Sequence, residues 1–234
     1  MSPQAANPLR ELLHIIFPAL CCHCGAVLVG DERQLCTACL SRLPWARLAA
    51  VPDNEVELRL AGRVPCQSAA SLLLFRQGNV AQTVVHQIKY QGNLPLAQQF
   101  GRLLGEELLA SGRFGDVDCL VPVPLHPLRK LKRGYNQSEL LCRAMSTVMG
   151  KPVVVGNLVR RRYTATQTRK NRQARMDNMA GVFAVRRPAS FEGKHLLLVD
   201  DIITTGATTE SCYTALRSIP ALRISVASLA IASN

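Results

Sequence analysis

Residues 195–210 read His195-Leu-Leu-Leu-Val-Asp200-Asp201-Ile-Ile-Thr204-Thr205-Gly206-Ala207-Thr208-Thr209-Glu210. The apolar run 196–199 has no polar face, which is typical of a central strand in a parallel sheet that is covered on both sides. Two carboxylates follow this run, and a turn of small residues leads into a helical pattern over 209–218. Ligands of open α/β sheets bind at the carboxyl ends of strands, so this stretch predicts both the fold class and the site.

The turn over 204–208 has the chemistry of a phosphate-binding loop. The first amides of a helix have no partner within the helix, and the helix dipole is positive at that end. Gly206 lets the backbone approach a ligand closely, and threonine hydroxyls add donors. We expect this turn to bind a phosphate through Thr204, Thr205, Gly206, Ala207 and Thr208.

The acidic pair Asp200-Asp201 would repel that phosphate, so it must serve another part of the ligand. Ionised carboxylates only accept hydrogen bonds, which makes ribose hydroxyls natural partners. Neither G-x-x-x-x-G-K-[ST] nor G-x-G-x-x-G occurs in the chain. The order of strand, acidic pair and Thr/Gly/Ala turn resembles the phosphoribosyl-pyrophosphate (PRPP) signature of type I phosphoribosyltransferases. The alternative is an ordinary loop in which Asp201 caps the helix, but a cap explains only one carboxylate.

Length and composition are those of a globular protein. The 234 residues, 48% hydrophobic and 19% charged, suffice for one well-buried α/β domain with a small appendage. No apolar run reaches 18 residues, so no membrane span is expected. The apolar stretch 12–20 contains His14 and Pro18, and no Lys or Arg precedes Arg10. We therefore interpret it as an amphipathic helix packed on the domain, not as a secretion signal, and expect a cytoplasmic location.

The chain divides by pattern into three segments. Residues 1–50 hold an N-terminal helix and a zinc-binding module, 51–115 a connector and a hood-like α/β segment, and 116–234 a phosphoribosyltransferase-like core. Helices are expected over 80–90, 94–110 and 139–149, and strands over 69–75, 118–124, 153–159, 181–185 and 223–232, with 118–124 as the first strand of the main sheet.

The spacing Cys21-x2-Cys24-x11-Cys36-x2-Cys39 predicts a metal site. Four thiolates complete a closed tetrahedral zinc site, which stabilises a segment too small to build its own core. The alternative is a redox dithiol, because a single Cys-x2-Cys also suits exchange chemistry. The total of nine cysteines is odd, which favours a reducing compartment over a disulfide framework.

The net charge of +12 comes from one region. Between His126 and Arg187 lie 15 Lys or Arg and two acids, whereas the rest of the chain carries 13 Lys or Arg and 14 acids. Such a field attracts polyanions, namely PRPP, pyrophosphate or nucleic acid. A solvated basic face without a partner is the alternative.

A second anion site is predicted where the strand 118–124 ends. In the following loop Gly134 gives close backbone access, and Arg133 can pair with an anion in a forked geometry. Asn136 or Ser138 can cap the next helix. Lys89, at the end of the helix 80–90, is a further candidate ligand, or simply part of a helix C-terminus.

The basic segment 159–175 is too charged to belong to the core. A lid that closes over the ligand fits this composition, since closing loops exclude water and complete a charge clamp. A solvated basic helix over about 168–178 is the alternative, and both can hold together.

Seven sequence features, spread over nearly the whole chain, match one protein family. They are the double Cys-x2-Cys, Lys89-Tyr90-x-Gly92, Val121-Pro122-Val123-Pro124-Leu125-His126, Arg133-Gly134-Tyr135-Asn136-Gln137-Ser138, Thr164-x-x-Gln167, Arg172 with Asn178, and Val199-Asp200-Asp201-x-x-Thr204-Thr205-Gly206-Ala207-Thr208. Jointly they resemble the ComF family of bacteria. The resemblance implies a phosphoribosyltransferase fold with an N-terminal zinc module, and a role in natural transformation or in the use of DNA as a nutrient. Tyr135 stands where the family usually has Phe.

Two functions follow from these patterns. In the first, an enzyme binds PRPP with bridging Mg²⁺, and Asp200 and Asp201 act as catalytic residues that stabilise an oxocarbenium-like state. In the second, a non-catalytic adaptor holds single-stranded DNA on its basic face and works with competence-machinery proteins. A PRPP sensor that acts through the zinc module is a third hypothesis, without a distinct sequence feature.

Overall fold

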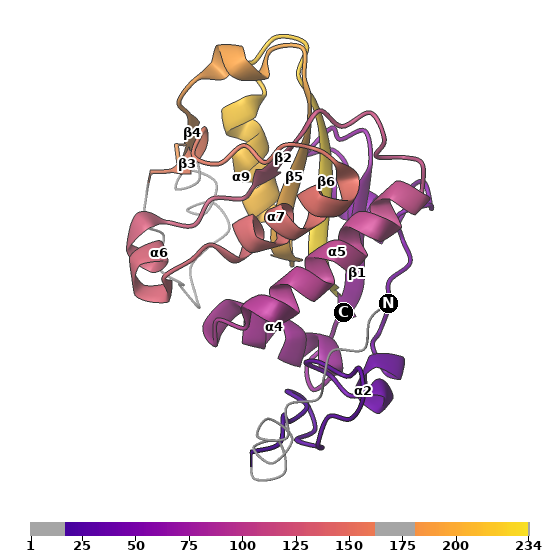
Figure 1. Ribbon diagram of the computed structural model, residues 1–234. Coiled ribbons are helices and arrows are strands. Elements are labelled where there is room, and N and C mark those ends of the chain that lie inside the picture. The colour runs from indigo at the N-terminus through magenta and orange to yellow at the C-terminus, as the bar shows by residue number, and fades with distance from the viewer. Residues whose placement is uncertain (1–16, 162–180, 234) are drawn as a thin grey trace.

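The computed structural model describes residues 17–161 and 181–233. Its main sheet has four parallel strands in the order β1-β6-β5-β2 (Figure 1). The strands are β1 (Ala69–Phe75), β2 (Cys119–Pro122), β5 (His195–Ile203) and β6 (Arg223–Ala232). Helices cover both faces, so the predicted parallel sheet flanked by helices is confirmed. Among the described residues no helix is both long and apolar enough to cross a membrane.

The side chains of strand β5 point alternately into two hydrophobic cores. Leu197 and Val199 pack with α4 (Val80–Tyr90), α5 (Leu94–Ala110) and α7 (Gln137–Met149) on one face. Leu196 and Leu198 pack on the other face with α3 (Glu55–Leu60) and α9 (Ala207–Leu216). Successive side chains of a strand point to opposite faces, and both faces are covered, which explains why 196–199 carries no polar residue.

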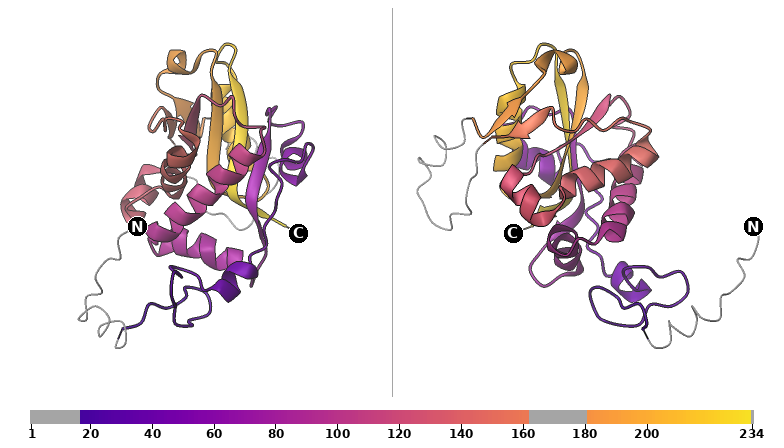
Figure 2. Two further views of the ribbon diagram at one scale, coloured as in Figure 1. Left: turned by 45° about the vertical axis from the view of Figure 1, so that its right-hand side comes forward. Right: turned by 60° about the vertical axis from the view of Figure 1, so that its left-hand side comes forward.

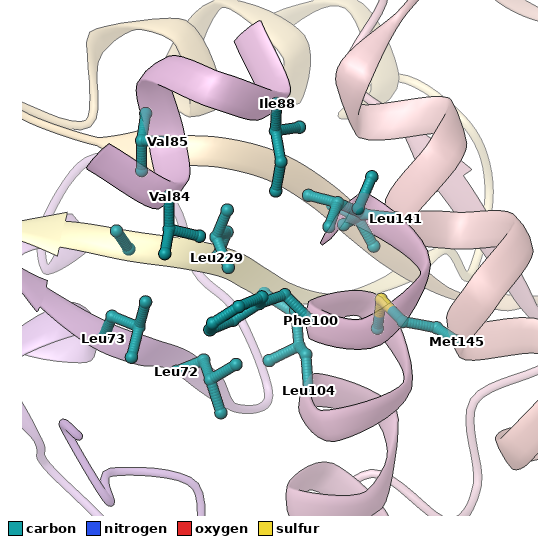
Figure 3. Close-up of a cluster of buried hydrophobic side chains, with 14 of the residues drawn as sticks. Leu72, Leu73, Val84, Val85, Ile88, Phe100, Leu104, Leu141, Met145 and Leu229 are labelled. Atoms are coloured by element: carbon teal, nitrogen blue, oxygen red, sulfur yellow. The ribbon is translucent and has the colours of Figure 1, made fainter. Parts of the chain in front are cut away.

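The larger core lies between the sheet and the three helices α4, α5 and α7. Figure 3 shows Phe100 of α5 between strand side chains such as Leu72 and the α7 residues Leu141 and Met145. Helices α5 and α7 pack closely, because Gly101 faces the α7 backbone. A Cβ atom on Gly101 would lie 2.7 Å from the Ala144 Cβ.

The elements predicted over 69–75, 80–90, 94–110 and 223–232 have the bounds expected from the sequence. The expectation that 118–124 is the first strand of the main sheet is wrong, because β1 precedes it and pairs with β6. Strand β2 lies at the end of the strand order, where Leu120 forms a parallel bridge with Val153. The segment 51–115 therefore contributes a strand to the same sheet as the C-terminal core.

Smaller elements differ from the prediction. The predicted connector contains α3, and the loop after β2 contains α6 (Pro127–Arg133). The predicted strands 153–159 and 181–185 are reduced to β3 (Leu158–Arg160) and β4 (Phe183–Val185), which form a separate antiparallel pair. A 3-10 turn (Pro188–Phe191) follows β4. Most of the predicted lid, the alternative helix 168–178 and the motif residues Thr164, Gln167, Arg172 and Asn178 lie outside the described residues.

The N-terminal module lies beyond α4 at one end of the molecule (Figure 2). It contains the short helix α2 (Thr37–Ser41) and an antiparallel bridge between Leu20 and Val27. Of the helix expected over 12–20, residues 17–20 are not helical and the rest lie outside the described residues. His23 Nδ1 lies 2.8 Å from Thr83 Oγ1 of α4, so polar contacts tie the module to the main domain.

Candidate functional site

The acidic pair lies near the end of β5, at the carboxyl edge of the sheet. Asp200 is 8% exposed and Asp201 is 5% exposed. The Asp200 carboxylate accepts hydrogen bonds from Ser138 Oγ, at 3.3 Å, and from the Asp201 amide, at 2.8 Å. Burial raises the pKa of Asp200 to about 8, and the neighbouring charge of Asp201 adds to the rise. Burial therefore favours the protonated form of this side chain.

Asp201 is held by side chains from two helices. Lys89 Nζ of α4 forms an ion pair with Asp201 Oδ2 at 3.2 Å, and Gln137 Nε2 of α7 donates to the same oxygen at 3.0 Å. The Ile202 amide donates to the other oxygen at 2.9 Å. The structure thus brings together Lys89 and Asp201, which are far apart in the sequence.

The turn 204–208 leads directly into α9. Helix α9 begins at Ala207, two residues before the sequence pattern predicted, and Gly206 is its N-cap with a left-handed φ of 80°. Thr204, Thr205 and Thr208 are exposed. The first amides of this ten-residue helix and three exposed hydroxyls therefore meet at one end of α9, beside the acidic pair in sequence.

Helix α3 was not predicted from the sequence, and its side chains support this turn. Arg59 Nη1 donates to the Thr204 carbonyl, and Arg63 Nη2 donates to the Thr205 carbonyl, both at 2.8 Å. Gly206 packs so closely here that an added Cβ would lie 2.9 Å from Leu60 Cδ2. The signal for α3 was present: Asn54 is an N-cap residue whose side chain accepts from the next turn.

The predicted second anion site lies at the end of α6. Gly134 ends this helix with a left-handed φ of 84°. The Arg133 guanidinium lies over the Tyr90 ring, 5.2 Å from its centroid, and Arg133 Nη1 donates to Gln137 Oε1 at 2.6 Å. Arg133 is thereby linked to the acidic pair through Gln137, a residue that was not among the predicted site residues.

The hydroxyl of Tyr135 has a structural role. It donates to the Ile88 carbonyl at 2.7 Å and accepts from the Gly92 amide at 3.0 Å. Tyr135 therefore joins the loop after α6 to the end of α4, close to Lys89. Of the two candidate caps for α7, Asn136 is the cap, and Ser138 binds Asp200 instead.

A cleft of about 910 Å³ opens between the exit of β2, α6 and the start of β3. Gly134 and Asn136 lie on its wall. Its described lining residues include one acid, Glu139, and four cations: Lys130, Arg160, Arg161 and Arg186. Part of the basic region of the sequence therefore gathers at this cleft, next to the loop that carries Arg133.

The four cysteines of the module converge. The Sγ atoms of Cys21, Cys24, Cys36 and Cys39 lie within 4.8 Å of one another, and those of Cys24 and Cys36 are 3.7 Å apart. Tetrahedral zinc with Zn–S bonds of about 2.3 Å places its sulfur ligands about 3.8 Å apart. The donor set and the spacing therefore fit a structural zinc ion.

The thiols of the module differ in acidity. Burial opposes ionisation of Cys21, but hydrogen bonds from the Cys24, Cys36 and His23 amides outweigh it and lower the pKa of the Cys21 thiol to about 6. Burial raises the pKa of Cys22 to about 11, and it also raises the pKa of Cys39 well above its usual value. Cys22 lies outside the group of four converging sulfur atoms.

Fold and site together define a class: an α/β protein with a buried acidic pair and a helix-start turn at the carboxyl edge of a parallel sheet, and a four-cysteine module at its N-terminal end. No protein-family model matches the chain. The DNA utilization protein YhgH of Salmonella typhi is 31% identical over 194 residues, which cover 81% of this chain and 74% of that protein. Competence protein F of Haemophilus influenzae is 30% identical over 216 residues, which cover 90% of this chain and 83% of that protein.

The chain therefore belongs to the ComF family. Among solved structures, glutamine PRPP amidotransferase of B. subtilis, complexed with ADP and GMP, matches with a TM-score of 0.42 and 18% identity. The match covers 62% of this chain and spans 30% of that longer chain.

Proposed function

We propose that the protein binds PRPP or a related phosphoribosyl ligand at the carboxyl end of β5, and that it serves the uptake or use of DNA. The proposed ligand rests on one observation. The buried pair Asp200-Asp201 is followed within three residues by the turn that starts α9. The names of its relatives, a DNA utilization protein and a competence protein, support the DNA role.

Each part of such a ligand has a chemical counterpart in the site. The turn 204–208 offers helix-start amides and exposed threonine hydroxyls to the 5-phosphate. The acceptor oxygens of Asp201 suit ribose hydroxyls. Arg133 and the backbone at Gly134 suit the pyrophosphate, and Lys89 adds a positive charge beside Asp201. Mg²⁺ bound with PRPP would neutralise part of the pyrophosphate charge.

If the protein is a transferase, the acidic pair has a second role. Loss of pyrophosphate leaves positive charge on the ribose ring, and a carboxylate fixed beside it stabilises that charge. Asp201, held by Lys89 and Gln137, is the carboxylate in this position, and the raised pKa of Asp200 favours a protonated form that can donate to a ligand oxygen.

Calorimetric titration of the zinc-loaded protein with PRPP and Mg²⁺ tests the proposal. We expect binding by the wild-type protein and a loss of at least about 100-fold in Asp200→Asn/Asp201→Asn, because the variant removes both carboxylates without changing their shape. Asp53→Asn is the matched control, since Asp53 is exposed and has a left-handed φ that Asn tolerates. Absence of PRPP binding by the wild-type protein would contradict the proposal.

Single-stranded DNA is a second candidate ligand, favoured by the excess of cations between His126 and Arg187 and by the basic cleft. Fluorescence anisotropy with a labelled oligonucleotide would then report an affinity that falls steeply with salt and is indifferent to the Asp200/Asp201 changes. Such a surface would suit an adaptor that works with competence-machinery proteins. Affinity independent of salt would contradict this candidate.

A further inference from the structure

Gln137 occupies a position between the two halves of the candidate site. It is the first residue of α7 and is 5% exposed. Its amide nitrogen donates to Asp201 Oδ2 at 3.0 Å, and its amide oxygen accepts from Arg133 Nη1 at 2.6 Å. A single buried side chain therefore spans the gap between the predicted ribose-binding carboxylate and the predicted anion-binding guanidinium.

An amide suits the chemistry at this position. An ionised carboxylate can only accept hydrogen bonds, and a guanidinium can only donate them. A linker between them must donate at one end and accept at the other while carrying no charge. Asn and Gln are the side chains that do so through one planar group, and both ends of Gln137 are satisfied in the only amide orientation that fits these partners.

The link leaves the Arg133 guanidinium available to a ligand. If Arg133 paired directly with Asp201, the carboxylate would neutralise its charge. Instead, Gln137 engages one nitrogen of the guanidinium while the Tyr90 ring lies against its face, so the guanidinium plane is held and other N–H donors remain for an anion. Asp201 keeps its charge balanced by Lys89.

We propose that Gln137 is a positioning residue that determines specificity, by fixing the Arg133 guanidinium relative to Asp201. This inference rests on the proposed function. Held at one separation, the two groups favour a ligand whose ribose carries a diphosphate on its anomeric carbon. PRPP is such a ligand, whereas ribose 5-phosphate has no diphosphate for Arg133 and free pyrophosphate has no ribose for Asp201.

The test compares three probes, each with Mg²⁺, by calorimetry: PRPP, ribose 5-phosphate and inorganic pyrophosphate. The variants are Gln137→Met, which keeps the length but not the hydrogen bonds, Gln137→Glu, Arg133→Met and the double variant Arg133→Met/Gln137→Met. Gln98→Met on the exposed face of α5 is the control for a Gln-to-Met change. Circular dichroism of each variant checks that it is folded.

We expect Gln137→Met to weaken PRPP binding by about 10- to 100-fold, the usual effect of losing hydrogen bonds to charged groups. The binding of ribose 5-phosphate and of pyrophosphate should weaken much less. The double variant should bind PRPP no more weakly than Arg133→Met, because Gln137 acts through Arg133. Gln98→Met should bind as the wild type does.

Gln137→Glu supplies a signature that a purely structural role would not give. In its ionised form the introduced carboxylate would still accept from Arg133 but would repel Asp201, whereas in its protonated form it could donate to Asp201 as the amide does. The affinity of this variant relative to the wild type should therefore be lower at pH 8 than at pH 6. Gln137→Met, which does not titrate, should keep the same ratio at both pH values.

Three results would overturn the inference: equal losses for all three probes, additive effects of Arg133→Met and Gln137→Met, or wild-type PRPP affinity in Gln137→Met. If the wild-type protein itself bound no PRPP, the proposed function and this inference would both fail. If the wild type bound PRPP and Gln137→Met bound it equally well, only the role of Gln137 would fail.

Discussion

At the scale of single residues, Asp200 is a carboxyl group whose burial and whose neighbour Asp201 both oppose its ionisation. Its pKa is raised from 3.8 to about 8, first by burial and then by Asp201. A folded-state pKa above the unfolded value means that the folded protein binds the proton more tightly. The stability due to this proton is fully present below about pH 4 and is lost as the pH rises through about 8.

Asp200→Asn should therefore change how stability depends on pH. Asn cannot ionise, so the melting temperature of the variant should rise relative to the wild type as the pH increases from about 5 to about 9. Thermal denaturation across this range, with Asp53→Asn as a charge-matched control, measures the difference. A difference between variant and wild type that stays the same across the whole range would contradict the raised pKa.

At the scale of elements, the α5–α7 contact depends on two glycines of α5. Gly101 and Gly105 weaken a helix by propensity, by roughly 1 kcal/mol each relative to Ala. In the folded protein they let two helices approach: a Cβ on Gly101 would lie 2.9 Å from the Leu141 carbonyl oxygen, and one on Gly105 would lie 3.3 Å from the Met145 Cα.

Gly101→Ala should destabilise the protein by about 1–3 kcal/mol, because overpacking against the α7 backbone outweighs the gain in helix propensity. Urea denaturation gives the free energy of unfolding. Gly105→Ala is the comparison variant. It should reduce the free energy of unfolding less than Gly101→Ala does, since the contacts of an added Cβ are longer there. A stabilised Gly101→Ala would show that the two helices can move apart freely.

At the scale of the whole molecule, we expect the four-cysteine module to unfold at lower cost than the sheet when metal is removed. The module has few buried residues besides its cysteines. The buried cysteines, with Leu35, pack at the margin of the core that α4 and α5 cover, and polar contacts of His23 with Thr83 and of Gln34 with Asn93 add to this packing. Without metal the four thiols lose the bonds that hold two knuckles together.

Removal of zinc by a chelator should therefore expose the amides of residues 21–40 to hydrogen exchange, while β5 and β6 keep their protection. Exchange measured by mass spectrometry, with and without added zinc, tests this. Simultaneous loss of protection in the module and in β5 would show that the two parts fold as one unit.

Much of the fold could be predicted from local patterns. The bounds of α4 and α5 follow from apolar periodicity and those of β1 and β6 from short apolar runs, and each segment carries its own signal. The short helices α3 and α6 were missed, because six or seven residues hold too few turns for a period to be visible. The reduced strands β3 and β4 were overestimated, since an apolar run alone does not say how far a ladder extends.

The sequence by itself determined that an apolar strand, an acidic pair and a helix-start turn follow one another, and that four cysteines have the spacing of a zinc site. These features are local, so order along the chain defines them. Only the tertiary structure decided that Lys89, Gln137 and the α3 arginines meet at the end of β5. They come from separate helices, and the packing of those helices on the two faces of the sheet brings them together, which no local pattern encodes.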